Sequence, residues 1–166
     1  MKLFKKQVVE VLGTVLKVGE KTESFTLTNQ SLEDIDSSTL KTAYLILNVV
    51  PSLDTSVCNI QTRKVHETLN DLKEALTITI SNDLPFAQKR WCGQEGLANI
   101  MTLSDYKHLD FAYKFGVLIK EHRLLARSIF VLDDARKVIY VEYVDNMSEE
   151  PNYDALFNFL NESGIK

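Results

Sequence analysis

Residues 43–58 read AYLILNVVPSLDTSVC, and this stretch decides the fold. Its first half, Ala43 to Val50, is an apolar run too short for a helix and ended by Pro51, the pattern of a buried central strand in an α/β sheet. Beyond Thr55 the apolar positions recur mostly at steps of three and four residues, at Val57, Ile60, Val65, Leu69, Leu72 and Leu76. This spacing predicts an amphipathic helix that begins near Cys58. Cys58 is therefore expected in a first helical turn, at the strand end where α/β sheets bind ligands.

The flanking segments continue the alternation of strands and helices. Val8–Leu12 and Val15–Val18 flank Gly13-Thr14 with the spacing of a two-residue β-hairpin. The other expected elements are strands Phe25–Thr28 and Leu76–Ser81, a helix capped and opened by Asn82–Pro85 with Cys92 near its end, a helix Asp110–Phe115, strands Ser128–Leu132 and Val138–Val144 around an Asp133-Asp134 turn, and a helix Asn152–Asn161. This order predicts a three-layer α/β sandwich with a parallel core and an antiparallel final hairpin, as one domain spanning residues 1–166.

The composition excludes several classes of protein. A hydrophobic fraction of 45% and a charged fraction of 25% are ordinary for a globular chain. The net charge of −4 would repel a phosphate backbone or an anionic bilayer, so neither nucleic acid nor a membrane is expected as a partner. Gln7 and Glu10 interrupt the N-terminal apolar stretch, which argues against a signal peptide. Two cysteines are too few for a disulfide scaffold, which favours the reducing cytoplasm.

Cys58 has the expected surroundings of a reactive thiol. In a first helical turn it meets unpaired backbone N–H groups and the positive end of the helix dipole, and both favour the thiolate. Arg63 and Lys64 are near in sequence, although a helix can point them away from the thiol. The residues alone leave a second interpretation open, in which Cys58 is a small buried hydrophobe under the helix.

The sequence around both cysteines resembles the peroxiredoxin family. PSLDTSVC, residues 51–58, is similar to the P-x-x-x-T-x-x-C loop of that family, with Cys58 at the position of the peroxidatic cysteine. SNDLPFAQKRWCGQEGL, residues 81–97, is similar to the segment that carries the resolving cysteine in the atypical two-cysteine branch, the thiol peroxidases. The resemblance continues through LLARSIFVLD (124–133) and YVEYVDNMSEEPNYDAL (140–156), and it departs from the family pattern at Ser24 and Ser56.

The resemblance implies a role for each of five residues. Cys58 is expected to be the peroxidatic nucleophile and Cys92 the resolving thiol. Thr55 would orient the thiolate and the peroxide, and Pro51 would limit access of solvent to the thiolate. Arg127 would stabilise the thiolate and the charge that grows on the departing oxygen, which suits its fixed guanidinium fork.

The same resemblance implies a fold, a reaction and partners. The expected fold is thioredoxin-like, a central mixed β-sheet flanked by helices with an N-terminal β-hairpin. The expected reaction is thiol-dependent reduction of hydrogen peroxide and alkyl hydroperoxides through a Cys58 sulfenic acid and an intramolecular Cys58–Cys92 disulfide. The expected electron donor is thioredoxin, the expected assembly is a homodimer, and neither a metal nor an organic cofactor is required.

Other interpretations compete with this one. His66, His108 and His122 lack the compact spacing of a zinc site and are expected at the surface or as caps. A disulfide reductase would carry C-x-x-C, but Gln61 stands where its second cysteine belongs. A redox sensor that uses Cys58 without turnover, and an inactive scaffold with two structural thiols, both remain open. Three aromatic residues either line an apolar approach to the site or pack in the core: Phe86, Trp91 and Phe115.

Overall fold

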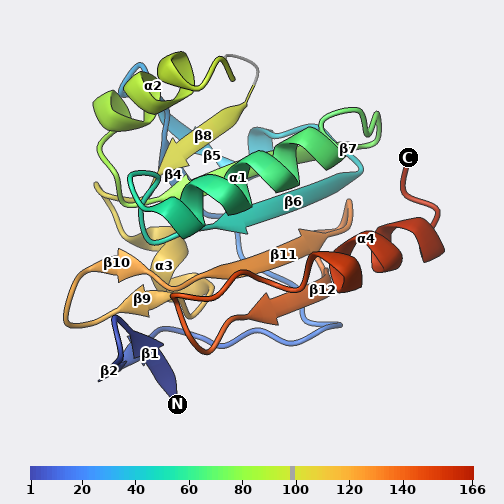
Figure 1. Cartoon of the computed structure of the whole chain (residues 1–166). Coiled ribbons are helices and arrows are strands. Elements are labelled where there is room, and N and C mark those ends of the chain that lie inside the picture. Colours follow the sequence, from blue (N-terminus) through green and yellow to red (C-terminus); the bar gives the residue numbers. More distant parts are fainter. Residues whose placement is uncertain (98–99) are drawn as a thin grey trace.

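The main β-sheet organises the chain, which the computed structural model describes over residues 1–97 and 100–166. The sheet has seven strands in the order β12-β11-β6-β7-β8-β4-β5 (Figure 1). These strands are β4 (Thr26–Thr28), β5 (Asp34–Asp36), β6 (Tyr44–Val49), β7 (Ala75–Ser81), β8 (Met101–Ser104), β11 (Ser128–Leu132) and β12 (Val138–Tyr143). The α-helices are α1 (Ser56–Leu69), α2 (Pro85–Gln94), α3 (Asp110–Lys114) and α4 (Tyr153–Glu162), with a 3-10 turn η1 (Ser37–Thr39). The sheet is mixed, because β6, β7 and β8 are parallel while β4, β5, β11 and β12 join in antiparallel pairs.

Strand β6 is buried on both faces, and its side chains alternate between two apolar clusters. Leu45, Leu47 and Val49 belong to the larger cluster, whereas Ile46 belongs to the cluster on the opposite face. Because successive side chains of a strand point to opposite faces, Asn48 shares the face of Ile46. The continuous apolar run in the sequence therefore serves two cores at once.

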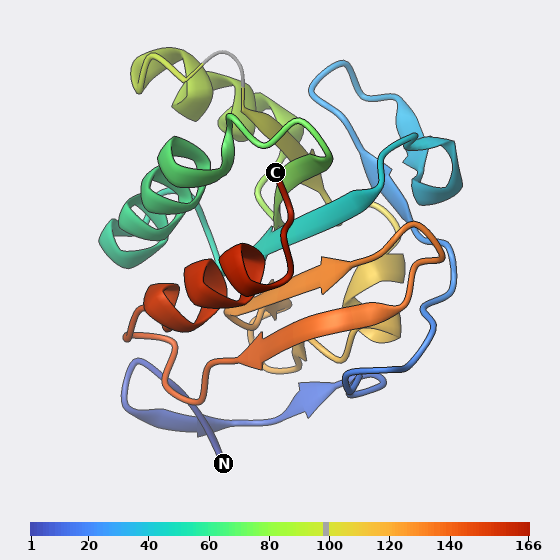
Figure 2. The ribbon, with the colours of Figure 1, turned by 90° about the vertical axis from the view of Figure 1, so that its right-hand side faces the viewer.

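Helices cover both faces of the sheet. Val65 of α1 and Leu156 of α4 pack in the cluster around Ile46, so these two helices share one face. Phe111 of α3 packs in the cluster on the other face. Figure 2 shows α1 and α4 on one side of the sheet and α3 on the other, which is the three-layer arrangement that the sequence predicts. Helix α2 packs beside β8, at the end of the molecule that carries the start of α1.

The structure confirms most of the expected elements and corrects one hairpin. The N-terminal β-hairpin pairs β1 (Lys2–Phe4) with β2 (Gln7–Val9). Its turn is Lys5-Lys6, with φ of 48° and 65°, and not Gly13-Thr14. Gly13 is instead a site of close approach, where a Cβ would collide with the carbonyl oxygen of Tyr113. Strand β3 (Val11–Leu12) pairs with β9 (Leu118–Ile119), which pairs with β10 (Leu124–Leu125).

The start of helix α2 also differs from the expectation. Pro85 opens the helix as predicted, but the N-cap residue is Leu84, which makes no side-chain cap hydrogen bond. The carboxylate of Asp83 instead accepts hydrogen bonds from the loop that precedes α1. Asp83 therefore links the loop before α1 to the segment before α2 and does not cap α2.

No helix in the described part of the chain has both the length and the apolarity that crossing a membrane requires.

Candidate active site

Cys58 lies in the first turn of α1, after the loop that follows β6. Its side chain is completely buried. Thr55 is the N-cap residue, and its Oγ1 accepts a hydrogen bond from the backbone N–H of Cys58 at 3.4 Å. A threonine oxygen at this position satisfies one of the helix's unpaired N–H groups. Pro51, two residues beyond the end of β6, is buried as well.

Arg127, the residue before β11, brings a buried cation to Cys58. Its Nη2 donates to the Cys58 Sγ at 3.4 Å, although the two residues are 69 positions apart. Its Nη1 donates to Gln61 Oε1 at 2.7 Å. Its Nη2 and Nε both donate to the carbonyl oxygen of Met147, at 2.7 and 3.2 Å. The guanidinium is thus held on three sides.

Arg127 forms no ion pair with a carboxylate within residues 1–97 and 100–166, and its side chain is only 1% exposed. A buried charge is costly unless an opposite charge compensates it. Cys58 is the acidic group in contact with the guanidinium, so Arg127 places a positive charge against the Cys58 sulfur.

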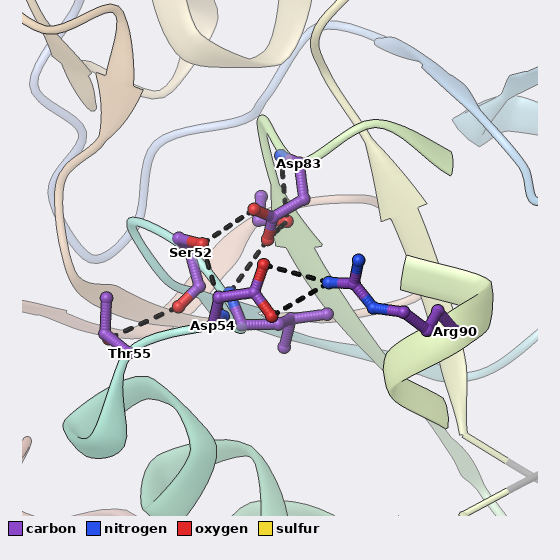
Figure 3. Close-up of polar contacts among 7 residues, drawn as sticks. Ser52, Asp54, Thr55, Asp83 and Arg90 are labelled. Carbon is purple, nitrogen blue, oxygen red and sulfur yellow. Dashed lines mark hydrogen bonds and ion pairs between the residues drawn. The ribbon is translucent and has the colours of Figure 1, made fainter. Parts of the chain in front are cut away.

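The loop between β6 and α1 is tied to the segment before α2 (Figure 3). Asp83 accepts hydrogen bonds from Ser52 Oγ at 2.7 Å and from the backbone N–H of Leu53 at 2.8 Å. The carboxylate of Asp54 receives both of its bonds from Arg90 Nη2 on α2, each at 3.1 Å. The loop that presents Cys58 is thus connected to the helix that carries Cys92.

Cys92 lies on α2 in a less polar environment. It is 5% exposed and shares a small cluster with Val50, Leu53, Cys58 and Trp91. Its Sγ lies 3.6 Å from Gln30 Nε2 and 3.9 Å from Thr102 Oγ1. Burial raises the pKa of the Cys92 thiol, and the two hydrogen bonds offset only part of that rise. Both cysteines are free thiols, and the fold packs them into one cluster.

The other charged and aromatic candidates have different places. Arg63 pairs with Glu95 and Lys64 pairs with Glu150, so neither is the cation beside Cys58. Phe115 is completely buried in the main core, Phe86 is 64% exposed, and Trp91 belongs to the small cluster that contains both cysteines. A groove beside the start of α1 is lined by Trp91 together with Leu53, Thr55 and Ile60, among others.

The histidines contradict one expectation. His66 is neither at the surface nor a cap, because its side chain is buried and its Nε2 lies 2.8 Å from Thr79 Oγ1. Burial lowers the pKa of His66 to about 4. His108 is a surface residue that contacts Asp34, as expected. Within the described residues, no three histidine, cysteine, aspartate or glutamate side chains are grouped so that they could hold a metal ion.

Three contributors to the site are missing from the sequence prediction. Gln61 and Met147 hold Arg127, and Asp83 holds the loop. Gln61 had a usable signal, since a residue three positions after Cys58 lies on the same helix face. Met147 acts through its backbone carbonyl, for which side-chain identity gives no signal.

Comparisons with known proteins agree with this geometry. The family model described as Redoxin matches residues 17–157. A thiol peroxidase of Listeria monocytogenes is 47% identical over 152 residues, 92% of each chain. A thiol peroxidase of Bacillus subtilis is 46% identical over 151 residues, 91% of this chain and 90% of that protein. The crystal structure of a peroxiredoxin-like protein from Aquifex aeolicus superposes with a TM-score of 0.87 at 35% identity, covering 95% of this chain and 94% of the other.

These matches confirm the expected thioredoxin-like α/β fold and the expected resemblance. They extend over nearly the whole chain and include both cysteine segments. The chain therefore belongs to the Redoxin family, in which it is a thiol-dependent peroxidase of the peroxiredoxin type.

Proposed function

We propose that Cys58 is the peroxidatic nucleophile and Cys92 the resolving thiol of this peroxidase. The observation that carries the proposal is the contact between the buried guanidinium of Arg127 and the Sγ of Cys58. Cys92 lacks such a contact among the described residues, and burial raises its pKa, so we assign Cys92 to the second step. The two cysteines have different environments because they perform different steps.

In the first step the Cys58 thiolate attacks an oxygen of a hydroperoxide. The S–O bond forms as the O–O bond breaks, and the departing oxygen leaves as water or an alcohol after it gains a proton. Arg127 can donate to that departing oxygen as its negative charge grows. Thr55 can turn its hydroxyl from the Ser52 carbonyl, which it contacts at 3.3 Å, towards the peroxide. Pro51 shields the thiolate from solvent.

In the second step the Cys92 thiolate attacks the Cys58 sulfenic acid. The S–S bond forms as the S–O bond breaks, and the sulfenic oxygen leaves as hydroxide, which gains a proton to become water, so two thiols have supplied the two electrons that reduce the peroxide. Both sulfur atoms are buried on different helices, α1 and α2. A disulfide requires the two Cα atoms within roughly 7 Å, and the family resemblance implies that they are farther apart in the reduced fold, so we propose that both helical segments unwind locally between the steps.

The remaining assignments belong to the same proposal. A dithiol protein reduces the exposed disulfide by exchange, and we take thioredoxin as that donor. The chain acts as one domain over residues 1–166, in the cytoplasm, and as a homodimer whose contact surface lies beside the active-site loops. The exposed apolar side chains of Leu84 and Phe86, at 51% and 64%, supply part of such a surface.

Intact mass after thiol trapping tests the assignment of the two cysteines. One equivalent of hydrogen peroxide added to the reduced protein should remove two hydrogens, in a disulfide that maps to Cys58 and Cys92. Cys58→Ser should abolish peroxide consumption, whereas Cys92→Ser should allow one oxidation and stop turnover with thioredoxin. Full turnover by Cys58→Ser, or thiols that both remain alkylatable after peroxide, would refute the proposal.

A further inference from the structure

A row of polar side chains crosses the core beneath α1 and leads away from the active site. Asn48 of β6 and Thr79 of β7 lie on the sheet face that α1 covers, and Gln61 and His66 descend from α1 to meet them. All four side chains are at most 3% exposed. Gln61 is also the residue that receives the Nη1 of Arg127.

Continuous hydrogen bonds join these side chains to Cys58. Gln61 Nε2 lies 2.5 Å from Asn48 Oδ1, and Asn48 Nδ2 lies 2.9 Å from Thr79 Oγ1. Thr79 Oγ1 lies 2.8 Å from His66 Nε2. With the two bonds of Arg127, the row connects His66 to the Sγ of Cys58 without a gap.

The direction of the bonds from Arg127 to Thr79 follows from Arg127, because a guanidinium only donates. Gln61 must therefore turn its carbonyl oxygen to Arg127 and its amide nitrogen to Asn48. Asn48 then accepts with its oxygen and donates with its nitrogen to the Thr79 oxygen.

The far end of the row depends on where the hydroxyl hydrogen of Thr79 goes. Within the described residues, Nε2 of His66 is the acceptor in contact with that hydroxyl, so we infer that Thr79 donates to it. In this arrangement His66 is a neutral imidazole that carries its proton on Nδ1.

We propose that Asn48, Thr79 and His66 are positioning residues that fix the amide orientation of Gln61 and thereby hold Arg127 against Cys58. A reversed Gln61 amide would point N–H groups at the N–H groups of Arg127 and push the guanidinium away from the thiol. His66 ends the row with an acceptor, which keeps Thr79, Asn48 and Gln61 in the productive orientation. The inference rests on the proposed function, since it matters for catalysis only if Cys58 is the nucleophile.

A purely structural role would also explain buried polar groups that satisfy one another, so the test must separate positioning from packing. Thr79→Val keeps the shape of the side chain and removes both of its hydrogen bonds, while Thr79→Ser keeps the hydroxyl. Thr77→Val is the matched control. Thr77 lies two positions away on the same strand face, and its buried Oγ1 has no hydrogen-bond partner within the described residues.

The first experiment measures the single oxidation of Cys58 in a Cys92→Ser background, together with the ultraviolet absorbance of the thiolate. Thr79→Val should slow the oxidation about fivefold, the equivalent of one hydrogen bond, and lower the thiolate absorbance at neutral pH. Thr79→Ser should restore both, and Thr77→Val should match the parent. A folded Thr79→Val that reacts at the parent rate, or an equal loss in Thr77→Val, would overturn the positioning role.

The second experiment determines the direction of the hydrogen bonds in this row and needs no peroxide. Nitrogen-15 NMR of the histidine rings in the wild-type chain distinguishes the two neutral tautomers, and His66 should carry its proton on Nδ1 at neutral pH. A proton on Nε2 would overturn the inference even if Thr79→Val failed to fold. A wild-type Cys58 that ignored peroxide would refute the proposed function instead, so the two failures are distinguishable.

Discussion

The surroundings of Cys58 and of Cys92 differ in charge although both thiols are buried in one cluster. Cys58 lies at a helix start beside a guanidinium that no carboxylate pairs with in the described chain. Cys92 lies within a helix, with a glutamine and a threonine as its polar neighbours, and burial raises its pKa. Burial alone therefore does not set the environment of a thiol, and the placement of one cation is the difference on which the proposed roles of Cys58 and Cys92 rest.

The largest effect is expected from removal of the cation, which should abolish this difference between the two thiols. Arg127→Gln keeps a planar donor but deletes the charge, so the Cys58 thiolate loses its compensating partner. We expect the oxidation of Cys58 by hydrogen peroxide to slow about 100-fold, the scale of a lost donor in an oxyanion site. Stopped-flow measurement of the intrinsic Trp91 signal provides the rate. Arg90→Gln is the matched control, since that arginine belongs to the Cys92 side. A loss of less than about threefold in Arg127→Gln would contradict the electrostatic account.

Local signals in the sequence predict the position of both thiols, whereas the contact between Arg127 and Cys58 is expected only from the family resemblance. The apolar run, Pro51 and the following helical period place Cys58 at the start of α1 because these are local signals. The bonds to Arg127 join residues 20, 66 and 69 positions apart, and no periodicity reports such pairings. The Gly13 error has a related cause, since that glycine is required by a close approach to Tyr113, 100 residues later, and not by a turn.

The buried side chain of His66, on the helix that carries Cys58, makes the stability of the fold depend on pH. The pKa of His66 in the folded state, about 4, lies below its ordinary 6.5, so the folded protein prefers the neutral ring. Its contribution to stability is full above pH 6.5 and is lost as pH falls through 4. At 1.36 kcal/mol per pH unit the loss approaches about 3 kcal/mol. Denaturant unfolding of wild type and His66→Gln, followed from pH 7 to about pH 4, should show the acid loss only in the wild type.

Asp105 titrates over part of the same pH range, but its effect on the stability of the fold has the opposite sign. A comparison of two proteins that both contain Asp105 is therefore needed. Its carboxylate accepts hydrogen bonds from the backbone N–H groups of Phe111 and Ala112, but burial raises its pKa to about 7. Its contribution is therefore full below its ordinary pKa of 3.8 and is lost as pH rises through 7. Because Asp105 is present in both proteins, the difference between wild type and His66→Gln isolates the histidine. Parallel pH profiles would contradict the assignment to His66.

Loss of the hydrogen bonds to Asp83 should affect the reactivity of Cys58 more than that of Cys92. Asp83→Asn replaces one acceptor oxygen by an amide nitrogen, so the bonds from Ser52, Leu53 and Ser81 cannot all persist. We expect a loss of about 1–3 kcal/mol in stability and a several-fold slower oxidation of Cys58, because Thr55 loses its fixed place. Chemical denaturation and single-turnover oxidation measure the two effects. Unchanged oxidation with normal stability would show that the loop holds its shape without Asp83.

The smallest effect is expected at the ion pair that links the two regions. Asp54 and Arg90 are 58% and 54% exposed, and an exposed pair contributes little because solvent screens it. Their bond nevertheless joins the Cys58 loop to α2, and in the proposed mechanism it breaks when the two helical segments unwind. Arg90→Gln should leave the first oxidation unchanged and speed disulfide formation about twofold.

Salt supplies an independent check on this last prediction, because screening weakens an exposed ion pair without any mutation. Raising the ionic strength should speed disulfide formation in the wild type and not in Arg90→Gln. Glu10→Gln is the control, since it breaks an equally exposed pair with Lys120 beside β9, at the opposite end of the molecule from α2 (Figure 1). The charge exchange Asp54→Arg with Arg90→Asp should restore the wild-type rate. The rate of disulfide formation could also stay unchanged in Asp54→Arg, in Arg90→Asp and at raised ionic strength. In that case the apolar cluster around Trp91, and not this ion pair, limits the unwinding of the two cysteine segments.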